Sequence, residues 1–189
     1  MKILFYFLFF ISSLLAQNKI YESKDIIIFE ETPKLETIVF WCGTGYATPK
    51  WIESQIDKNY ISKYNFILVS YNTSIDFVKK IYTEKTSKNL TPDIILGFSR
   101  GGLQAQKNYS PNYKIFGLID PVLDAKLRFT SYKNIIITYN SNNWSYDYGK
   151  TLGYFGRMVA RGGGIWTFEL LDHKDLLLEG LLLTILPQL

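Results

Sequence analysis

The sequence predicts an α/β fold in which a mostly parallel sheet of about six to eight strands is flanked by helices. Short runs rich in Ile, Val and Phe alternate along the chain with segments whose apolar residues recur at helical spacing. The 189 residues have the length of one domain and contain no internal repeat or linker. The residues best suited to chemistry each follow an apolar run, at the edge of a parallel sheet where ligands bind.

The first residues are typical of a secretory signal peptide. Lys2 is followed by fourteen uncharged residues from Ile3 to Ala16, fewer than the about 20 residues that span a membrane. We expect cleavage after Ala16, a single mature domain over residues 17–189 without a stable membrane span, and export to the periplasm or the medium. The alternatives are an uncleaved anchor that holds the protein in the membrane, or a buried first strand.

Seven apolar runs predict strands, because β-branched and aromatic residues dominate them and turn-forming residues bound them. Their continuous apolar character is typical of strands that are covered on both faces. In chain order they are 26–29, 38–41, 66–70, 94–96, 115–119, 135–139 and 165–171.

Helices are expected between most of these strands. Thr48 followed by Pro49 is typical of an N-cap and a first helical residue. Thr73 with Asp76 predicts a capping box for the next helix. Further helices are expected after Gly101, around 148–159 and from about 174 to 186. The residues expected to face the core are Ile52, Ile56 and Tyr60 in the first helix, Phe77, Val78 and Ile81 in the second, and Tyr148, Leu152, Phe155 and Val159 in the fourth.

The strand at 94–96 leads into Gly97-Phe98-Ser99-Arg100-Gly101, which has the pattern G-x-S-x-G. In such a pattern a serine nucleophile occupies a strained strand-to-helix turn, and the glycines let neighbouring chains approach closely. In this stretch the chain resembles the α/β-hydrolase superfamily. The resemblance implies a small α/β-hydrolase without a cap domain, of the serine esterase or lipase type, that cleaves an ester through an acyl-enzyme intermediate.

The resemblance further implies that Ser99 is the nucleophile and His173 its base. Ser, acid, His is the order of the triad along the chain in this superfamily, and His173 follows the last expected strand. A serine hydroxyl is a poor nucleophile until a base takes its proton, and histidine titrates near neutral pH. The competing interpretations are a turn serine and a surface histidine.

Two backbone N–H groups are expected to form the oxyanion hole, those of Arg100 and Thr44. In the superfamily one donor follows the nucleophile, and the other lies in an early loop often spelled His-Gly-x. Cys42-Gly43-Thr44 resembles that loop with Cys in place of His, and Gly45 is the alternative donor. Cys42 itself is expected to be a small buried residue.

Asp120 and Asp147 compete for the position of the triad acid. The superfamily usually places the acid after the strand before last, where this sequence has Asn140 to Asn143 with Asp147 four residues later. A minority, resembling the pancreatic lipases and platelet-activating-factor acetylhydrolases, place it one strand earlier. Gly117-Leu118-Ile119-Asp120-Pro121 resembles their Gly-Leu-Asp-Pro stretch, so Asp120 is preferred. Asp147 is the alternative acid, and an asparagine or no acid stays open.

Composition limits the other functions. The net charge of +4 is spread along the chain, which argues against nucleic-acid binding. One cysteine and one histidine exclude a disulfide framework, a cysteine zinc site and a multi-histidine metal site, and no cofactor is expected. The expected substrate is a small-molecule, lipid or polymeric ester. The aromatic residues expected near the mouth of the site are Trp41, Tyr46, Phe98, Trp144 and Tyr146.

Other activities remain open at this stage. A thioesterase or acyltransferase would use the same triad, since a fold does not choose its substrate. The alternative from another class is a catalytically inactive protein with a hydrolase fold that binds a ligand or associates with the cell envelope. The sequence does not predict the oligomeric state.

Overall fold

The computed structural model describes residues 18–30, 35–56, 63–124, 134–140 and 164–168, together with Asp175 and Leu177. The expected leader at 1–16 and the helix around 148–159 lie outside the described residues, as does most of the expected helix at 174–186. Among the described residues, no helix has the length and apolar character needed to cross a bilayer. The elements in chain order are β1 (Lys19–Glu22), β2 (Ile26–Phe29), β3 (Thr37–Trp41), α2 (Pro49–Gln55), β4 (Asn65–Val69), α4 (Ile75–Thr86), β5 (Ile94–Phe98), α5 (Gly101–Lys107), β6 (Ile115–Ile119), β7 (Ile135–Asn140) and β8 (Gly164–Phe168).

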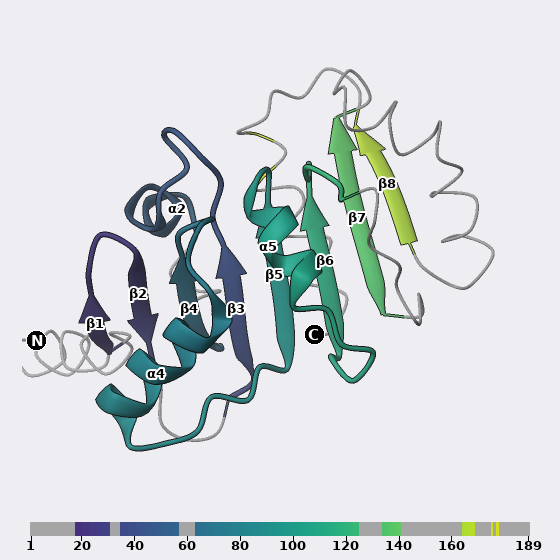
Figure 1. Ribbon diagram of the computed structural model, residues 1–189. Coiled ribbons are helices and arrows are strands. Elements are labelled where there is room, and N and C mark those ends of the chain that lie inside the picture. Colours follow the sequence, from purple (N-terminus) through teal and green to yellow (C-terminus); the bar gives the residue numbers. More distant parts are fainter. Residues whose placement is uncertain are drawn as a thin grey trace, which may run out of the picture.

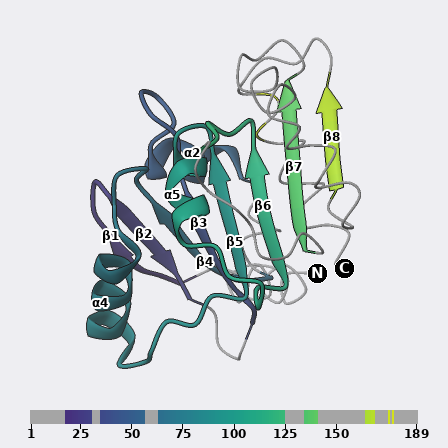
Figure 2. The same ribbon diagram turned by 45° about the vertical axis from the view of Figure 1, so that its right-hand side comes forward.

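These strands form one eight-stranded sheet in the order β1-β2-β4-β3-β5-β6-β7-β8 (Figure 1). β1 pairs with β2, and β2 with β4, in antiparallel orientation, and all other pairs are parallel. The arrowheads of the parallel strands β3 to β8 therefore meet at one edge, which we call the carboxyl edge (Figure 2). The prediction of a mostly parallel sheet with helices is confirmed.

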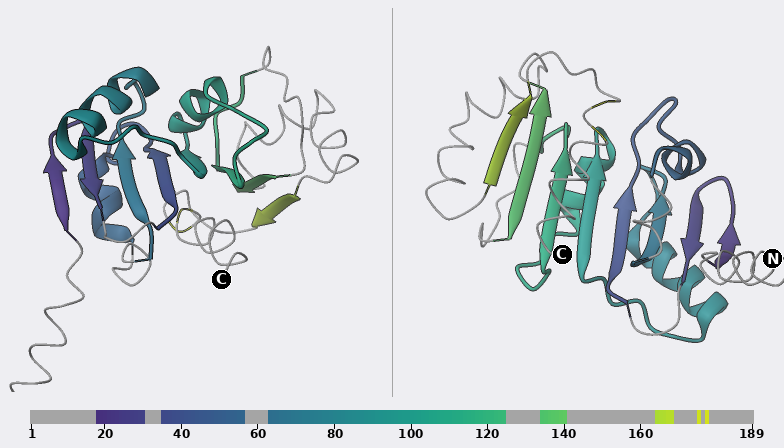
Figure 3. Two further views of the ribbon diagram at one scale, coloured as in Figure 1. Left: turned by 90° about the horizontal axis from the view of Figure 1, so that it is seen from below. Right: turned by 180° about the vertical axis from the view of Figure 1, so that it is seen from behind.

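Helices cover both faces of the sheet, which explains why the strand sequences are continuously apolar. α4 and α5 lie on one face and α2 lies on the other (Figure 3). A hydrophobic cluster lies on each face of the sheet. Val78 of α4 and Ala105 of α5 belong to the cluster on one face, and Ile52 of α2 and Leu177 belong to the cluster on the other. The residues of β2 to β6 are buried throughout.

The start of α4 differs from its prediction. Ser74 is the N-cap, and its side chain accepts a hydrogen bond from the Phe77 N–H. Thr73, which was expected to cap this helix, is buried and its carbonyl accepts a 2.9 Å hydrogen bond from the indole Nε1 of Trp41. The contact with Trp41 holds Thr73 at the end of β3, so the capping role falls to the next hydroxyl residue.

Phe77 also differs from its prediction, because it is 47% exposed instead of facing the core. The buried residues of α4 are Val78 and Tyr82, one helical turn apart. Phe77 is next to the buried residues in the sequence and fits the helical spacing of apolar residues, but its position on the helix leaves it exposed.

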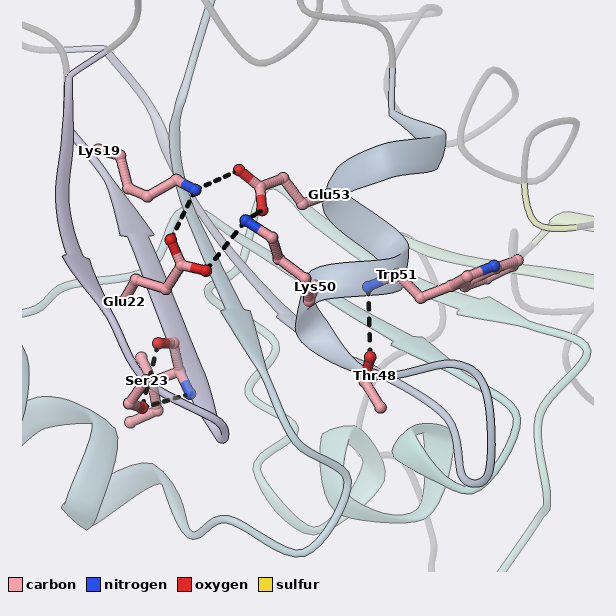
Figure 4. A network of polar contacts seen from close by, with 8 residues as sticks. Lys19, Glu22, Ser23, Thr48, Lys50, Trp51 and Glu53 are labelled. Carbon is pink, nitrogen blue, oxygen red and sulfur yellow. Dashed lines mark hydrogen bonds and ion pairs between the residues drawn. The ribbon is translucent and has the colours of Figure 1, made fainter.

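β1 was not expected from the sequence, because its Lys-Ile-Tyr-Glu stretch lacks the continuous apolar run of the other strands and is mostly exposed. A closed ring of four ion pairs attaches this strand to α2 (Figure 4). Lys19 lies 2.8 Å from Glu22 and 2.6 Å from Glu53, and Lys50 lies 2.9 Å from each of the same two carboxylates. Each charged side chain in the ring therefore pairs with two side chains of the opposite charge.

The ring shifts the pKa of three of its members. The hydrogen bonds from Lys19 and Lys50 lower the pKa of Glu22. Pairing with Glu53 and Glu22 raises the pKa of Lys50. Burial acts to raise the pKa of Glu53, but its hydrogen bonds with the two lysines outweigh burial and lower it.

Glu53→Gln is expected to lower the melting temperature by about 2 °C at low ionic strength, because a partly exposed ion-pair network contributes modestly. The loss should shrink in about 1 M salt, where screening is strong. The loss should also shrink at acidic pH. Because the pKa of Glu53 is lowered in the folded protein, its carboxylate stabilises the fold at pH values above the unfolded pKa of about 4.3, and this contribution disappears as the pH falls through the folded value. Calorimetry across salt and pH measures both trends.

Glu84→Gln is the matched control. Glu84 is exposed and its 3.9 Å pair with Lys80 belongs to no ring. An equal loss of melting temperature in the two variants would show that the ring adds nothing beyond an isolated surface pair.

Candidate active site

Ser99 follows β5 directly and has a left-handed backbone with φ = 54°. Its N–H donates a 3.0 Å hydrogen bond to the carbonyl of Ile119 on the neighbouring strand. Its own carbonyl accepts hydrogen bonds from the N–H groups of Gly102 and Val122, both at 3.0 Å. The strained strand-to-helix turn expected from the G-x-S-x-G pattern is therefore present in the structure.

Asp120 occupies the equivalent place one strand along, directly after β6. Phe98 and Ile119 are register partners in the parallel pair of β5 and β6, so Ser99 and Asp120 follow adjacent strand ends. Asp120 is 2% exposed and also left-handed, with φ = 41°. The only other described non-glycine residue with positive φ is Ser87, the C-cap of α4.

The carboxylate of Asp120 is directed toward the end of β7. Its Oδ1 accepts a 3.2 Å hydrogen bond from the N–H of Asn140, the last residue of that strand. Its own N–H donates to the carbonyl of Thr138 at 2.7 Å. A buried carboxylate is thus fixed at the carboxyl edge, next to the turn that carries Ser99.

The loop at 42–48 lies against the Ser99 turn from the other side. A Cβ atom on Gly43 would lie 3.2 Å from the Cβ of Ser99, and one on Gly101 would lie 2.2 Å from the carbonyl oxygens of Trp41 and Cys42. Only a residue without a side chain fits the second contact. The first turn of α5 can therefore sit directly on the end of β3.

The predicted oxyanion donors flank this contact. Thr44 is half-buried and Arg100 is exposed. Within the described part of the chain, no hydrogen bond uses the backbone N–H of either residue. Gly45, the alternative donor, has φ = 66° and forms the turn of the loop. Among the described residues, the N–H groups of Thr44 and Arg100 therefore have no competing acceptor.

The aromatic residues expected at the mouth divide into two groups. Trp41 and Phe98 are fully buried and belong to the core. Tyr46 is 43% exposed, and its ring makes an edge-to-face contact with that of Trp51 on α2, with the centroids 4.9 Å apart. Among the described members of this set, Tyr46 alone has an exposed ring, and Trp51, which was not singled out from the sequence, packs against it.

Cys42 is fully buried, as expected, and burial raises the pKa of its thiol. A thiol kept protonated is a poor nucleophile. His173, Asp147, Trp144 and Tyr146 lie outside the described residues, so the assignments made for them remain predictions.

No group of three or more His, Cys, Asp and Glu able to hold a metal ion occurs among the described residues. A half-open cavity of about 380 Å³ lies between α4 and the end of α5, where Asp93, Asn108 and Tyr113 contribute to its lining. Asp93 precedes β5, whereas Ser99 follows it. The cavity is therefore at the opposite edge of the sheet from Ser99 and does not belong to the candidate site.

The fold is similar to that of known esterases and serine hydrolases. The structure of Est2, a thermophilic esterase from the planctomycete Thermogutta terrifontis with butyrate bound, matches at a TM-score of 0.52 and 15% identity, over 88% of this chain and 92% of that chain. FphF, a fluorophosphonate-binding serine hydrolase from Staphylococcus aureus with substrate bound, matches at 0.50 and 10% identity, over 87% and 94%. No family model and no curated protein matches the sequence. The chain thus has an α/β-hydrolase fold, and none of its described residues forms a cap domain.

Gly101→Ala is expected to lower the free energy of unfolding by about 3 kcal/mol or more, because its methyl group would overlap main-chain atoms that cannot turn aside. The matched control is Gly45→Ala. No atom lies within 4 Å of its new Cβ, so its cost is limited to the left-handed backbone, about 1 kcal/mol. Urea denaturation measures both. Equal losses would contradict the close contact between α5 and the end of β3.

Proposed function

We propose that this protein is a serine hydrolase that cleaves an ester through an acyl-enzyme intermediate, with Ser99 as nucleophile, His173 as base and Asp120 as acid. One observation carries the proposal: the left-handed turn of Ser99 at the carboxyl end of a central parallel strand, in contact with the loop at 42–48. A strained non-glycine backbone at such a place is costly and is typical of functional sites.

In the proposed reaction the Oγ of Ser99 attacks the ester carbonyl carbon while His173 takes the hydroxyl proton. The carbonyl oxygen becomes an oxyanion and accepts hydrogen bonds from the N–H groups of Thr44 and Arg100. Collapse of the tetrahedral intermediate breaks the bond to the alcohol, which leaves with the proton from His173. Water, deprotonated by the same histidine, then attacks the acyl-enzyme, and the free acid departs as Ser99 is restored.

Asp120 is proposed to orient His173. A buried carboxylate beside the imidazole fixes its tautomer and stabilises the imidazolium that forms during attack. The burial of Asp120 and its hydrogen bond from the Asn140 N–H support this role, because they hold the carboxylate in one orientation. The alternative acid, Asp147, lies outside the described residues and remains a prediction.

The proposed substrate is a small-molecule, lipid or polymeric ester. Tyr46 supports this choice, because a large exposed ring three residues after Gly43 offers a contact for an apolar part of the substrate. The same triad would serve a thioester, so the ester is distinguished by assay and not by the fold.

Ser99→Ala is expected to lower ester turnover by a factor on the order of 10⁴ or more without unfolding the protein, because members of a triad act as a unit. The measurement is the hydrolysis of p-nitrophenyl butyrate together with a melting curve. Ser54→Ala, which removes an exposed hydroxyl from α2, should keep the wild-type rate. A Ser99→Ala protein with near wild-type turnover would exclude Ser99 as nucleophile.

Asp120→Asn is expected to lower kcat by a factor on the order of 10⁴, since the amide still accepts a hydrogen bond but leaves the imidazole in the wrong tautomer. Asp147→Asn is the comparison and should cost only about a few-fold. Steady-state kinetics on both variants decides between the two acids. If the larger loss falls on Asp147→Asn, the acid lies in the loop after β7 and the Ser99–His173 part of the proposal stands.

A further inference from the structure

The side chain of Gln106 is buried in α5, the helix that follows Ser99, with only 1% of the residue exposed. Its Nε2 donates hydrogen bonds to the carbonyls of Gly102, at 2.9 Å, and Val122, at 2.8 Å. Its Oε1 accepts a 3.1 Å hydrogen bond from the N–H of Asp124. Two carbonyls and one N–H thus surround a side chain that has two N–H donors and one carbonyl.

This arrangement selects an amide. A carboxylate in the same place would face two carbonyl oxygens without a proton to share. An apolar side chain would remove the hydrogen bonds to the carbonyl of Val122 and from the N–H of Asp124, which are part-buried, and each such hydrogen bond contributes about 0.5–1.5 kcal/mol.

Two of the three groups that Gln106 binds, the carbonyl of Val122 and the N–H of Asp124, belong to the segment at 121–124, which directly follows Asp120. Two further contacts fasten this segment to the start of α5. The Val122 N–H donates to the carbonyl of Ser99 at 3.0 Å, and a Cβ on Gly102 would lie 2.6 Å from the Cβ of Pro121. The chain after Asp120 is therefore attached to the Ser99 turn and to α5 by four contacts: the hydrogen bonds of Gln106 with Val122 and Asp124, the hydrogen bond to the Ser99 carbonyl, and the close approach of Gly102 to Pro121.

Strain explains why this attachment is needed. Asp120 and Ser99 are both left-handed, and such residues persist only where their surroundings over-determine the backbone. On its N-terminal side Asp120 is held by the sheet, through β6 and the hydrogen bond to the Thr138 carbonyl. On its C-terminal side the described segment at 121–124 is not a strand, and Gln106 contributes two hydrogen bonds that hold it.

We propose that Gln106 is a positioning residue, which holds Asp120 in its left-handed turn against the Ser99 turn and so fixes the direction of the acid. The catalytic part of this inference rests on the proposed function. Gln106 acts through Asp120 and does not itself touch the reacting atoms. Its effect on turnover must therefore depend on the presence of the Asp120 carboxylate.

The test is a double-mutant cycle with Gln106→Met, which keeps the length of the side chain and removes its amide. In the wild-type background the variant should lower kcat by about tenfold or more with KM within about twofold, because positioning acts on the chemical step. In the Asp120→Asn background the same change should lower kcat by less than about twofold, since coupled residues are not additive. Gln104→Leu, on the same helix, is the control and should leave kcat unchanged.

A second readout does not depend on activity. Amide hydrogen exchange of the peptide that contains 120–124 should be faster in Gln106→Met by about tenfold or more, and unchanged in Gln104→Leu. Gln106→Asn, which keeps the amide on a side chain shorter by one methylene, provides the same comparison if the methionine variant does not fold.

Unchanged exchange in this peptide, or an equal loss of kcat in both backgrounds, would overturn the inference. Failure of the proposed function is recognised separately, because a fluorophosphonate probe would then leave Ser99 unlabelled in the wild-type protein. In that case the exchange result still decides whether Gln106 holds the Asp120 turn.

Discussion

The left-handed backbone of Ser99 is the constraint on which the candidate site depends. For a residue with a side chain this conformation costs roughly 1–2 kcal/mol relative to an ordinary one. The structure offsets the cost by satisfying both backbone polar groups of Ser99, with one hydrogen bond to β6 and two from the chain that follows. These hydrogen bonds fix the turn at the edge of the sheet.

Strand register then determines what surrounds this turn. Trp41 pairs with Gly97, and Phe98 pairs with Ile119, so the loop after β3, Ser99 and Asp120 follow three consecutive strands of the sheet. Segments far apart in the sequence are thereby brought to one edge. The sheet order makes this possible, because β5 lies between β3 and β6.

Much of this architecture could be predicted from the sequence, and the exceptions have physical causes. The buried strands were predicted because strands covered on both faces must be apolar throughout. β1 was missed because this exposed strand is held by pairing with β2 and by the ion-pair ring, neither of which leaves a local pattern. The N-cap of α4 was placed one residue early because the indole of Trp41 binds Thr73 across 32 positions of the chain.

In the candidate site, too, some features could be predicted from the sequence and others could not. Ser99, Asp120 and the loop at 42–48 were predicted from local motifs, and the structure places all three at one edge of the sheet. Gln106 was not predicted, because its importance lies in contacts with residues 16 and 18 positions away. A polar residue in the buried stripe of a short helix was the available signal, since a buried amide requires partners.

The claim that Ser99 is the nucleophile has a direct chemical consequence, because an acyl group must be attached to it during turnover. Rapid mixing of the protein with p-nitrophenyl butyrate, followed by acid quenching and peptide mass spectrometry, detects that group. One butyryl group is expected on the peptide that contains Ser99, and it should form in a burst and be lost as the acid is released. Steady hydrolysis of the ester with the butyryl group on another residue, or on none, would contradict this claim.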